Sequence, residues 1–342
     1  MFKKPSLQMM CGDGFFGVVQ GEILRYVNLG GTEKMNEREQ TVDVIIPVYR
    51  PGKEFRTLLE RLMQQEYPLS RIIIMNTEES FWDPALEQKF PQLEVHHLTK
   101  AEFDHGGTRK QAAALSGGEI LVCMTQDAMP ANRKLIGNLI KALNRDNVGA
   151  AYARQLPKKD CSYLERYTRS FNYPETSGIK TAADTKTSGI KTYFCSNVCA
   201  AYRKDIYEKM GGFPEKAIFN EDMILAGKMV QNGYGIAYAA DAQVYHSHNY
   251  TPLMQFHRNF DLGVSQAQNP EIFQGVPSEG EGMKLVKKTF LHLCKSGRIR
   301  LLPALILQSG AKYAGYLCGK NYRKLPQGLI RHFTMNQEYW NS

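Results

Sequence analysis

The chain has 342 residues, of which 43% are hydrophobic and 23% charged, a composition that excludes disordered, collagen-like and coiled-coil proteins. No apolar run reaches the roughly 18 residues that span a bilayer, so we predict that the chain does not cross a membrane. The net charge of +9 is concentrated near the C-terminus. Residues 283–342 hold eleven Lys and Arg residues and one acid, so they carry +10 and the rest of the chain carries −1.

The first 40 residues show no sustained hydrophobic period and end in a charged stretch, which predicts a poorly ordered N-terminal arm over residues 1–40. They contain no convincing signal peptide, because residues 11–14 (CGDG) interrupt the apolar stretch. The seven cysteines are an odd number and form no CxxC pair. We therefore predict reduced thiols in a cytoplasmic protein.

From Thr41 onward, strands and helices alternate in the order that builds a mostly parallel sheet. Apolar runs predict strands, and helical spacing of apolar residues predicts helices between them. The predicted strands are 42–46, 72–75, 93–98 and 120–124, and the predicted helices are 53–65 and 107–115. This order predicts a Rossmann-like, nucleotide-binding half over residues 41–130.

The following residues, 131–282, are less regular. The stretch 172–192 is polar and contains Thr-Ser-Gly-Ile-Lys-Thr twice, which predicts a mobile loop that closes over the site. Beyond it we predict strands near 193–202, at 236–239 and ending at 245, and helices that open near Asn220 and after Thr251.

The basic segment 283–342 is also rich in Leu, Ile, Phe and Tyr. Interleaved basic and apolar residues are typical of a helix that lies on an anionic membrane surface. We therefore predict a basic, amphipathic helical extension that binds the inner face of a membrane peripherally. A solvated helical tail that only keeps the protein soluble is the alternative. Nucleic acid is not expected as a partner, because no recognised binding module accompanies the charge.

Polar clusters follow the predicted strands at their carboxyl ends, where open α/β sheets bind ligands. Residues 47–50 (PVYR) bring an aromatic ring and a cation to the sheet edge. Residues 104–109 (DHGGTR) open a helix, where glycines allow a ligand to approach the backbone, the helix N-terminus favours an anion and Arg109 can bind a phosphate. A Gly-rich turn with a surface arginine is the alternative for this second cluster.

A third cluster, residues 125–130 (TQDAMP), follows the hydrophobic strand 120–124. An acid at the end of a buried strand is costly to bury, so it tends to be paired or to hold a cation. Asp127 is therefore a candidate metal ligand. A helix N-cap is the alternative, which Pro130 and the distance to the helix near Asn132 disfavour.

The fourth cluster combines Glu221 and Asp222 with His246. Adjacent acids at a helix start can simply complement the helix dipole. A carboxylate placed to take a proton, accompanied by a histidine that binds a metal, is the catalytic interpretation. The His-Ser-His spacing alone does not indicate a zinc site, because no further ligands lie at finger-like spacing.

Together and in this order, the clusters resemble the inverting family 2 glycosyltransferases with the GT-A fold, in their rhamnosyltransferase-like branch. The resemblance covers residues 41–265. Seven segments carry it: IPVYR (46–50), HGGTRKQAA (105–113), TQDAMP (125–130), SNVCAAYR (196–203), GGFPE (211–215), NEDM (220–223) and YHSHNY (245–250). Two positions depart from the family's pattern, since TQD replaces the usual D-x-D and Asn76-Thr77-Glu78 replaces the usual acidic strand end.

The resemblance implies an α/β fold of the GT-A type: a Rossmann-like nucleotide-binding half over residues 41–130, an acceptor-binding half over 131–282, and the helical basic extension 283–342. It also implies the roles of individual residues. Asp222 would be the general base with Glu221 beside it, Asp127 and His246 would bind Mg²⁺ or Mn²⁺, and the nucleotide-sugar donor would be bound by Pro47, Tyr49, Glu78, Arg109 and Asp127.

The function implied is inverting transfer of a sugar, with dTDP-L-rhamnose as donor and a saccharide or lipid-linked saccharide as acceptor in cell-surface polysaccharide synthesis. A family 2 transferase that uses a UDP-sugar is the alternative. A sugar-phosphate nucleotidylyltransferase shares the GGTR string, but there the string follows the first strand, whereas residues 106–109 follow the third. A non-catalytic, membrane-bound adaptor would lack the base or the metal ligands, yet Asp127, Asp222 and His246 are all present.

Overall fold

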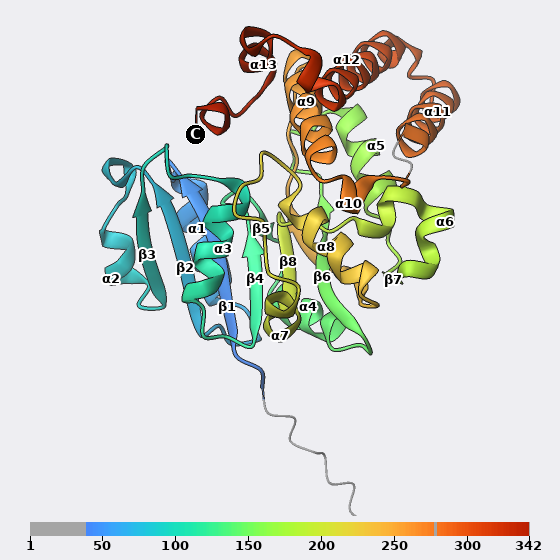
Figure 1. The fold of residues 1–342 in the computed structure, drawn as a ribbon. Helices are drawn as coiled ribbons and strands as arrows, with labels where there is room; N and C mark the ends of the chain where they lie inside the picture. Colours follow the sequence, from blue (N-terminus) through green and yellow to red (C-terminus); the bar gives the residue numbers. More distant parts are fainter. Residues whose placement is uncertain (1–38, 277–278, 342) are drawn as a thin grey trace, which may run out of the picture. The chain divides into compact units, whose positions relative to one another are not determined.

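The first half of the domain is a parallel sheet whose strands end together at one edge (Figure 1). The computed structural model describes residues 39–276 and 279–341, so the predicted N-terminal arm lies outside the described residues except for its last two. Strands β1 (Val42–Tyr49), β2 (Arg71–Thr77), β3 (Leu93–Leu98) and β4 (Ile120–Met124) pair in parallel in the order β3-β2-β1-β4. The predicted bounds of β3 and β4 are confirmed, and so is the Rossmann-like order of this half.

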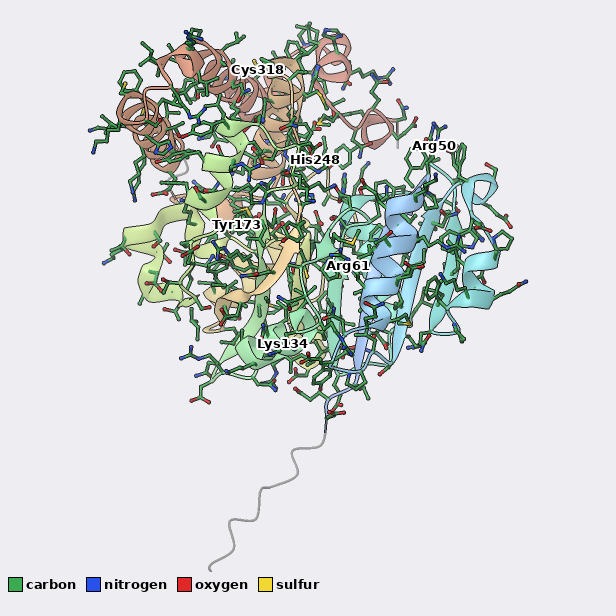
Figure 2. The ribbon with its side chains drawn as sticks, turned by 180° about the vertical axis from the view of Figure 1, so that it is seen from behind. Arg50, Arg61, Lys134, Tyr173, His248 and Cys318 are labelled. Atoms are coloured by element: carbon green, nitrogen blue, oxygen red, sulfur yellow. The ribbon has the colours of Figure 1, made fainter. Side chains whose placement is uncertain are left out.

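Helices cover both faces of the sheet and bury one apolar cluster on each. Helices α1 (Lys53–Met63) and α4 (Leu135–Leu143) pack on one face, which is toward the viewer in Figure 2. Helices α3 (His105–Leu115), α7 (Lys204–Lys209) and α8 (Glu221–Gln231) cover the other, and the short α2 (Ala85–Lys89) follows β2. The result is a three-layer α/β/α arrangement, in which a strand buried on both faces has a continuous apolar sequence.

The second half extends the same sheet with mixed strands. β8 (Cys199–Arg203) pairs antiparallel with β4 and with β6 (Val148–Leu156), and β9 (Gly235–Tyr245) runs parallel to β6. The short β5 (Met129–Pro130) pairs with the end of β9. The two strands predicted at 236–239 and before 245 are one bulged strand, and the strand predicted from 193 begins only at Cys199.

The stretch 172–192, predicted to be a mobile loop that closes over the site, contains an edge strand of the sheet and short helical turns. β7 (Gly178–Lys180) pairs antiparallel with β9, and the one-turn helix α6 (Thr185–Ser188) follows it. The ammonium group of Lys180 donates hydrogen bonds to the carbonyl oxygens of Lys191 and Phe194, at 2.8 and 2.6 Å. These bonds join the last residue of β7 to the 3-10 turn that follows. They therefore hold this turn against the edge of the sheet.

The C-terminal residues form the helices α9 (Pro252–Gln268), α10 (Pro270–Phe273), α11 (Glu279–Lys295), α12 (Leu302–Lys320) and α13 (Gln327–Phe333), with α5 (Tyr163–Asn172) beside them. Most of these helices lie above the β6 and β8 side of the sheet in Figure 1, while α13 and the C-terminal end lie above β1–β4. A Cβ atom at Gly263, Gly315 or Gly319 would lie within 2.4 Å of a carbonyl oxygen on the facing helix. Helices α9 and α12 therefore pack backbone against backbone, which only glycine permits. Among the described residues no helix is both long and apolar enough to span a membrane.

Candidate active site

A cavity of about 470 Å³ opens at the carboxyl ends of β1, β2 and β4. Three residues predicted to bind the donor line it: Pro47, Tyr49 and Arg109. Residues at the ends of the neighbouring strands, Thr77 and Gln126, line it as well. The edge at which the sequence placed the ligand thus contains a cavity of the size that small-molecule sites have.

Tyr49 contributes an exposed aromatic ring to the lining of this cavity, which also includes Phe103. The Tyr49 ring is 37% exposed and lies edge-on to Phe81, with ring centroids 6.2 Å apart, and the guanidinium of Arg50 sits 5.1 Å from its centroid. The Gln126 side chain fixes the Tyr49 backbone, because its Oε1 accepts from Tyr49 N–H at 2.8 Å and its Nε2 donates to Tyr49 O at 3.0 Å. The ring is therefore held open to a flat ligand such as a nucleobase.

Glu78 lies behind this surface. It does not line the cavity, and its carboxylate instead approaches the ammonium of Lys100, a lining residue, at 3.8 Å. Backbone strain marks this region, since Arg50, Glu78 and Asn220 all have positive φ, at 49°, 66° and 62°. Among the described residues only one other non-glycine residue, Asn147, has a positive φ. Such strain persists where the surrounding structure holds it, often at functional sites.

The start of α3 is fixed by Asp104 and by two glycines. Asp104 Oδ1 accepts from the backbone N–H groups of Gly106 and Gly107, both at 2.8 Å, and from Ala217 N–H at 3.0 Å. A Cβ atom at Gly106 would lie 2.4 Å from the carbonyl oxygen of Pro214. These glycines therefore allow close packing on the segment 214–217, and the expected reason, close approach of a ligand, is not needed to explain them.

Arg109 is bound to Glu221. Its Nη1 lies 3.0 Å from Glu221 Oε1, and the two side chains are only 6% and 8% exposed. Asn197 Nδ2 donates to the same carboxylate oxygen at 3.0 Å. A buried charge is costly without such a partner, so the main role visible for Arg109 is to pair with Glu221, the neighbour of Asp222.

Asp222 is a half-buried carboxylate at the first turn of α8. Its Oδ2 accepts from Asn197 N–H at 2.9 Å and its Oδ1 from Met223 N–H at 2.8 Å. Burial and then the negative charge of Glu221 raise the pKa of Asp222 to about 7. A carboxylate with this pKa can exchange a proton near neutral pH, as a general base must.

A second cluster joins Asp127 to two histidines. The ligand atoms of Asp127, His246 and His248 all lie within 4.8 Å of one another. Asp127 Oδ2 is 3.4 Å from His246 Nε2 and 3.1 Å from His248 Nε2. Figure 2 shows His248 at the same end of the sheet as Arg50. One carboxylate oxygen and two imidazole nitrogens at this spacing could hold a divalent cation.

The protonation states of this cluster suit metal binding. Burial lowers the pKa of His246 to about 3, so its imidazole is neutral at neutral pH. Burial opposes the ionisation of Asp127, but the hydrogen bond from His248 and the interaction with His246 outweigh it and lower the pKa of this carboxyl group. Metal ligands must be a neutral imidazole and an ionised carboxylate, and this site supplies both.

Residues behind His246 orient its ring. Gln155 Oε1 lies 3.0 Å from His246 Nδ1, and Arg169 donates from Nη1 to the same oxygen. Because an amide oxygen can only accept, His246 carries its proton on Nδ1, and the lone pair of Nε2 faces Asp127. Neighbouring side chains thus fix the orientation of the His246 ring.

Several residues of the site were missed in the sequence. His248 was given no role from the sequence, because the His-Ser-His spacing alone did not indicate a zinc site. Side chains two residues apart in an extended segment point to the same side, so His248 could have been grouped with His246. Asn197, within the segment SNVCAAYR, contacts both acids of α8 and was not assigned a role. Met335, Asn336 and Glu338 line the cavity from the C-terminal segment, and no local pattern indicated this.

Comparison with known proteins places these motifs in context. The family model "Glycosyl transferase family 2" matches residues 43–211. The chain is 37% identical over 305 residues to the O-antigen chain rhamnosyltransferase RfbN of Salmonella typhimurium, covering 88% of this chain and 96% of that protein. It is 38% identical over 304 residues to the O-antigen chain rhamnosyltransferase WbaN of Salmonella anatum, covering 87% and 95%.

Among solved structures, the fold is similar to that of the mannosyltransferase PcManGT from Pyrobaculum calidifontis, determined in complex with GDP-Man and Mn²⁺. The TM-score is 0.53 at 18% identity, covering 89% of this chain and 85% of that one. At this identity the likeness concerns the fold alone, and the predicted GT-A fold is confirmed.

Proposed function

The chain belongs to glycosyltransferase family 2, and we propose that it transfers L-rhamnose from dTDP-L-rhamnose, with inversion, to a saccharide or lipid-linked saccharide of an O-antigen-type polysaccharide. The observation that carries the proposal is the identity of 37% to an O-antigen chain rhamnosyltransferase over nearly the whole length of both chains. The intact candidate base and the cluster of metal-ligating side chains support it.

Asp222 is the general base of this proposal. Its carboxylate takes the proton of the acceptor hydroxyl while that oxygen bonds to the anomeric carbon of the donor, and the bond from this carbon to the diphosphate breaks. One displacement inverts the anomeric centre and releases the nucleoside diphosphate. Burial is the main cause that raises the pKa of Asp222 to about 7, and Glu221 supports this step because its negative charge raises this pKa further.

The cavity beside Asp222 suits the donor nucleotide. Tyr49 offers an open ring for the base, and Lys100 and Arg50 add positive charge around it. Pro47 and Arg109 also line the cavity, and Arg109 joins it to Glu221 of α8. Glu78 orients Lys100 from behind, which gives this acid an indirect place in donor binding.

Asp127, His246 and His248 are the proposed ligands of Mg²⁺ or Mn²⁺. Their donor atoms, spacing and protonation states fit a divalent cation. When bound, the cation supplies positive charge that neutralises the leaving diphosphate. Gln155 and Arg169 keep the Nε2 of His246 free to bind it.

The C-terminal helices support peripheral binding to the cytoplasmic face of an anionic membrane. An uncharged, exposed stripe follows one face of α12, opposite the glycines that pack on α9. Its members are Ile306, Leu307, Gly310, Tyr313, Ala314 and Leu317. The segment 283–342 supplies +10 of charge around it, and the same helices lie over the end of the sheet that holds the site (Figure 1).

Nucleotide binding tests the donor. Thermal unfolding of the full chain is compared with dTDP, UDP and GDP, each with and without Mg²⁺ or Mn²⁺, because a ligand that binds the native state raises its stability. We expect the largest, metal-dependent stabilisation with dTDP. A preference for UDP would retain the transferase and reject rhamnose, and no stabilisation by any nucleotide would reject the transferase assignment.

Flotation with vesicles tests the membrane surface. We expect the full chain to bind vesicles of phosphatidylglycerol and phosphatidylcholine, and the double variant Ile306→Glu/Leu307→Glu to lose this binding. The variant Glu66→Gln, which changes an exposed residue next to α1, is the control that should still bind. Equal binding by all three proteins would exclude the α12 stripe as the membrane contact.

A further inference from the structure

We propose that the C-terminal segment Thr334–Trp340, here called the C-terminal wall, forms one side of the donor pocket, and that Asp261 is the positioning residue that holds it there. The inference rests on the proposed function, since it concerns the same cavity. It assigns a role in donor binding to residues that lie beyond the matched family region, 43–211.

The residues that line the cavity are the first evidence that the C-terminal wall borders it. Ten of its thirteen lining residues come from positions 47–126, and the other three, Met335, Asn336 and Glu338, come from the C-terminal wall. The Met335 side chain is 50% exposed, although the residue before it, Thr334, is buried. The chain thus turns from the interior to the cavity at this point, and its polar and apolar side chains line the same cavity as Tyr49.

A buried carboxylate determines the position of this turn. Asp261, in the middle of α9, is only 3% exposed. Its Oδ1 accepts from the hydroxyl of Thr334 at 2.7 Å, and its Oδ2 accepts from the backbone N–H of Met335 at 2.9 Å. Thr334 Oγ1 in turn accepts from Asn336 N–H at 3.0 Å. A buried carboxylate without such donors is costly, so α9 and the wall stabilise each other.

A second set of contacts fixes the other end of the wall. The hydroxyl of Tyr339 donates to Gln268 Oε1 at 2.9 Å, and the ammonium of Lys216 lies 4.8 Å above the Tyr339 ring. Lys216 precedes Ala217, whose N–H is bound by Asp104 at the start of α3. The residues that line the cavity therefore lie between two anchors, one on α9 and one beside the helix that carries Arg109.

The exposed groups of the wall suit the nucleoside of the donor. Within the described part of the chain, the amide Nδ2 of Asn336 has no hydrogen-bond partner, so it remains a donor toward the cavity. Among the residues that the structure describes, the carboxylate of Glu338 accepts only from Asn341, at 3.2 Å, and it can accept from a further hydroxyl. An amide donor and a carboxylate acceptor in the same cavity as an exposed aromatic ring match the hydrogen-bonding groups and the flat base of a nucleoside.

Two variants test the wall in the full chain. Thr334→Val removes the hydroxyl bound by Asp261 and keeps the volume of the side chain. Asn336→Ala removes the free amide and the bond that its Oδ1 accepts from Tyr339 N–H at 3.3 Å, and it leaves the two bonds of Asp261 in place. We expect each to raise the KM for the donor and the Kd for dTDP by about tenfold, the effect of one hydrogen bond, with kcat changed far less. Thr334→Ser keeps the hydroxyl and should restore the wild-type Kd.

The matched control is Thr289→Val, which removes another buried hydroxyl from the C-terminal helices, one that donates to Leu285 O at 2.8 Å within α11. It should leave donor KM and Kd unchanged. Unchanged Kd in both Thr334→Val and Asn336→Ala, while the wild-type protein binds dTDP, would overturn the role of the wall alone. A wild-type protein that binds no nucleotide would overturn the proposed function and this inference with it.

Discussion

The surroundings of Asp127 and Asp222 shift the pKa of the same residue type in opposite directions. Burial favours the protonated form at both positions. At Asp127 the two histidines outweigh burial, whereas at Asp222 the charge of Glu221 adds to it. One aspartate is therefore suited to bind a cation and the other to take a proton, and neighbouring side chains decide which.

The largest expected effect comes from the base region. Asp222→Asn should lower kcat by about 100- to 10,000-fold, because the amide cannot accept the acceptor proton. Binding of dTDP should stay within twofold of the wild type, or ~0.4 kcal/mol, since Asp222 does not line the nucleotide cavity. Steady-state kinetics and calorimetry measure both. Asp205→Asn, at an exposed residue paired with Arg203, is the control, and substantial transfer by Asp222→Asn would remove Asp222 from its role.

The cation region should respond differently. Asp127→Ala should abolish the stabilisation by Mn²⁺ or Mg²⁺, which amounts to about 2.7 kcal/mol at a metal concentration 100 times Kd. Thermal unfolding with and without metal measures it. His96→Gln, at a half-exposed histidine paired with Glu94 on β3, is the control that should keep the full stabilisation. If Asp127→Ala kept it as well, the cluster would be structural and the contrast between the two aspartates would be lost.

A smaller effect concerns the negative charge of Glu221, which raises the pKa of Asp222, whereas the two histidines beside Asp127 lower the pKa of that residue. In the wild type, kcat should rise about tenfold per pH unit below the Asp222 pKa of about 7 and level off above it. Glu221→Gln removes the negative neighbour and should move this midpoint to lower pH by about one unit. Glu215→Gln, at an exposed acid paired with Lys110, should leave the profile in place. A midpoint unchanged by Glu221→Gln would show that burial alone sets the pKa.

The two sites should also affect the free energy of unfolding in opposite ways. Between its ordinary pKa of 3.8 and about 7, Asp222 binds a proton in the native state that the unfolded chain has released, so its contribution falls as the pH rises through this window. The pKa of Asp127 is lowered, so its contribution is present above 3.8 and is lost as the pH falls. Urea unfolding against the wild type measures the two signs, with Asp222→Asn compared at pH 5 and 7 and Asp127→Asn at pH 3 and 5.

Local pattern predicted the first half of the domain well. The strands 93–98 and 120–124 have the predicted bounds, because an apolar run between polar turns specifies a buried strand by itself. Predictions were poorer in the second half, where β9 is one bulged strand and β8 starts six residues later than expected. The bounds of β8 and β9 depend on parallel and antiparallel pairing with strands that are far away in the chain. A local sequence pattern contains little information about such pairing.

By itself, the sequence determined the order of strands and helices, the concentration of charge in 283–342 and the polar clusters at the strand ends. Periodicity and composition are local properties, so they can be read without the fold. Only the tertiary structure decided that Arg109 pairs with Glu221, that His248 joins Asp127, and that the C-terminal wall borders the donor cavity. Thr334 and Asp261 are 73 positions apart, and what joins them is a buried carboxylate that needs donors, a requirement that exists only once the chain has packed.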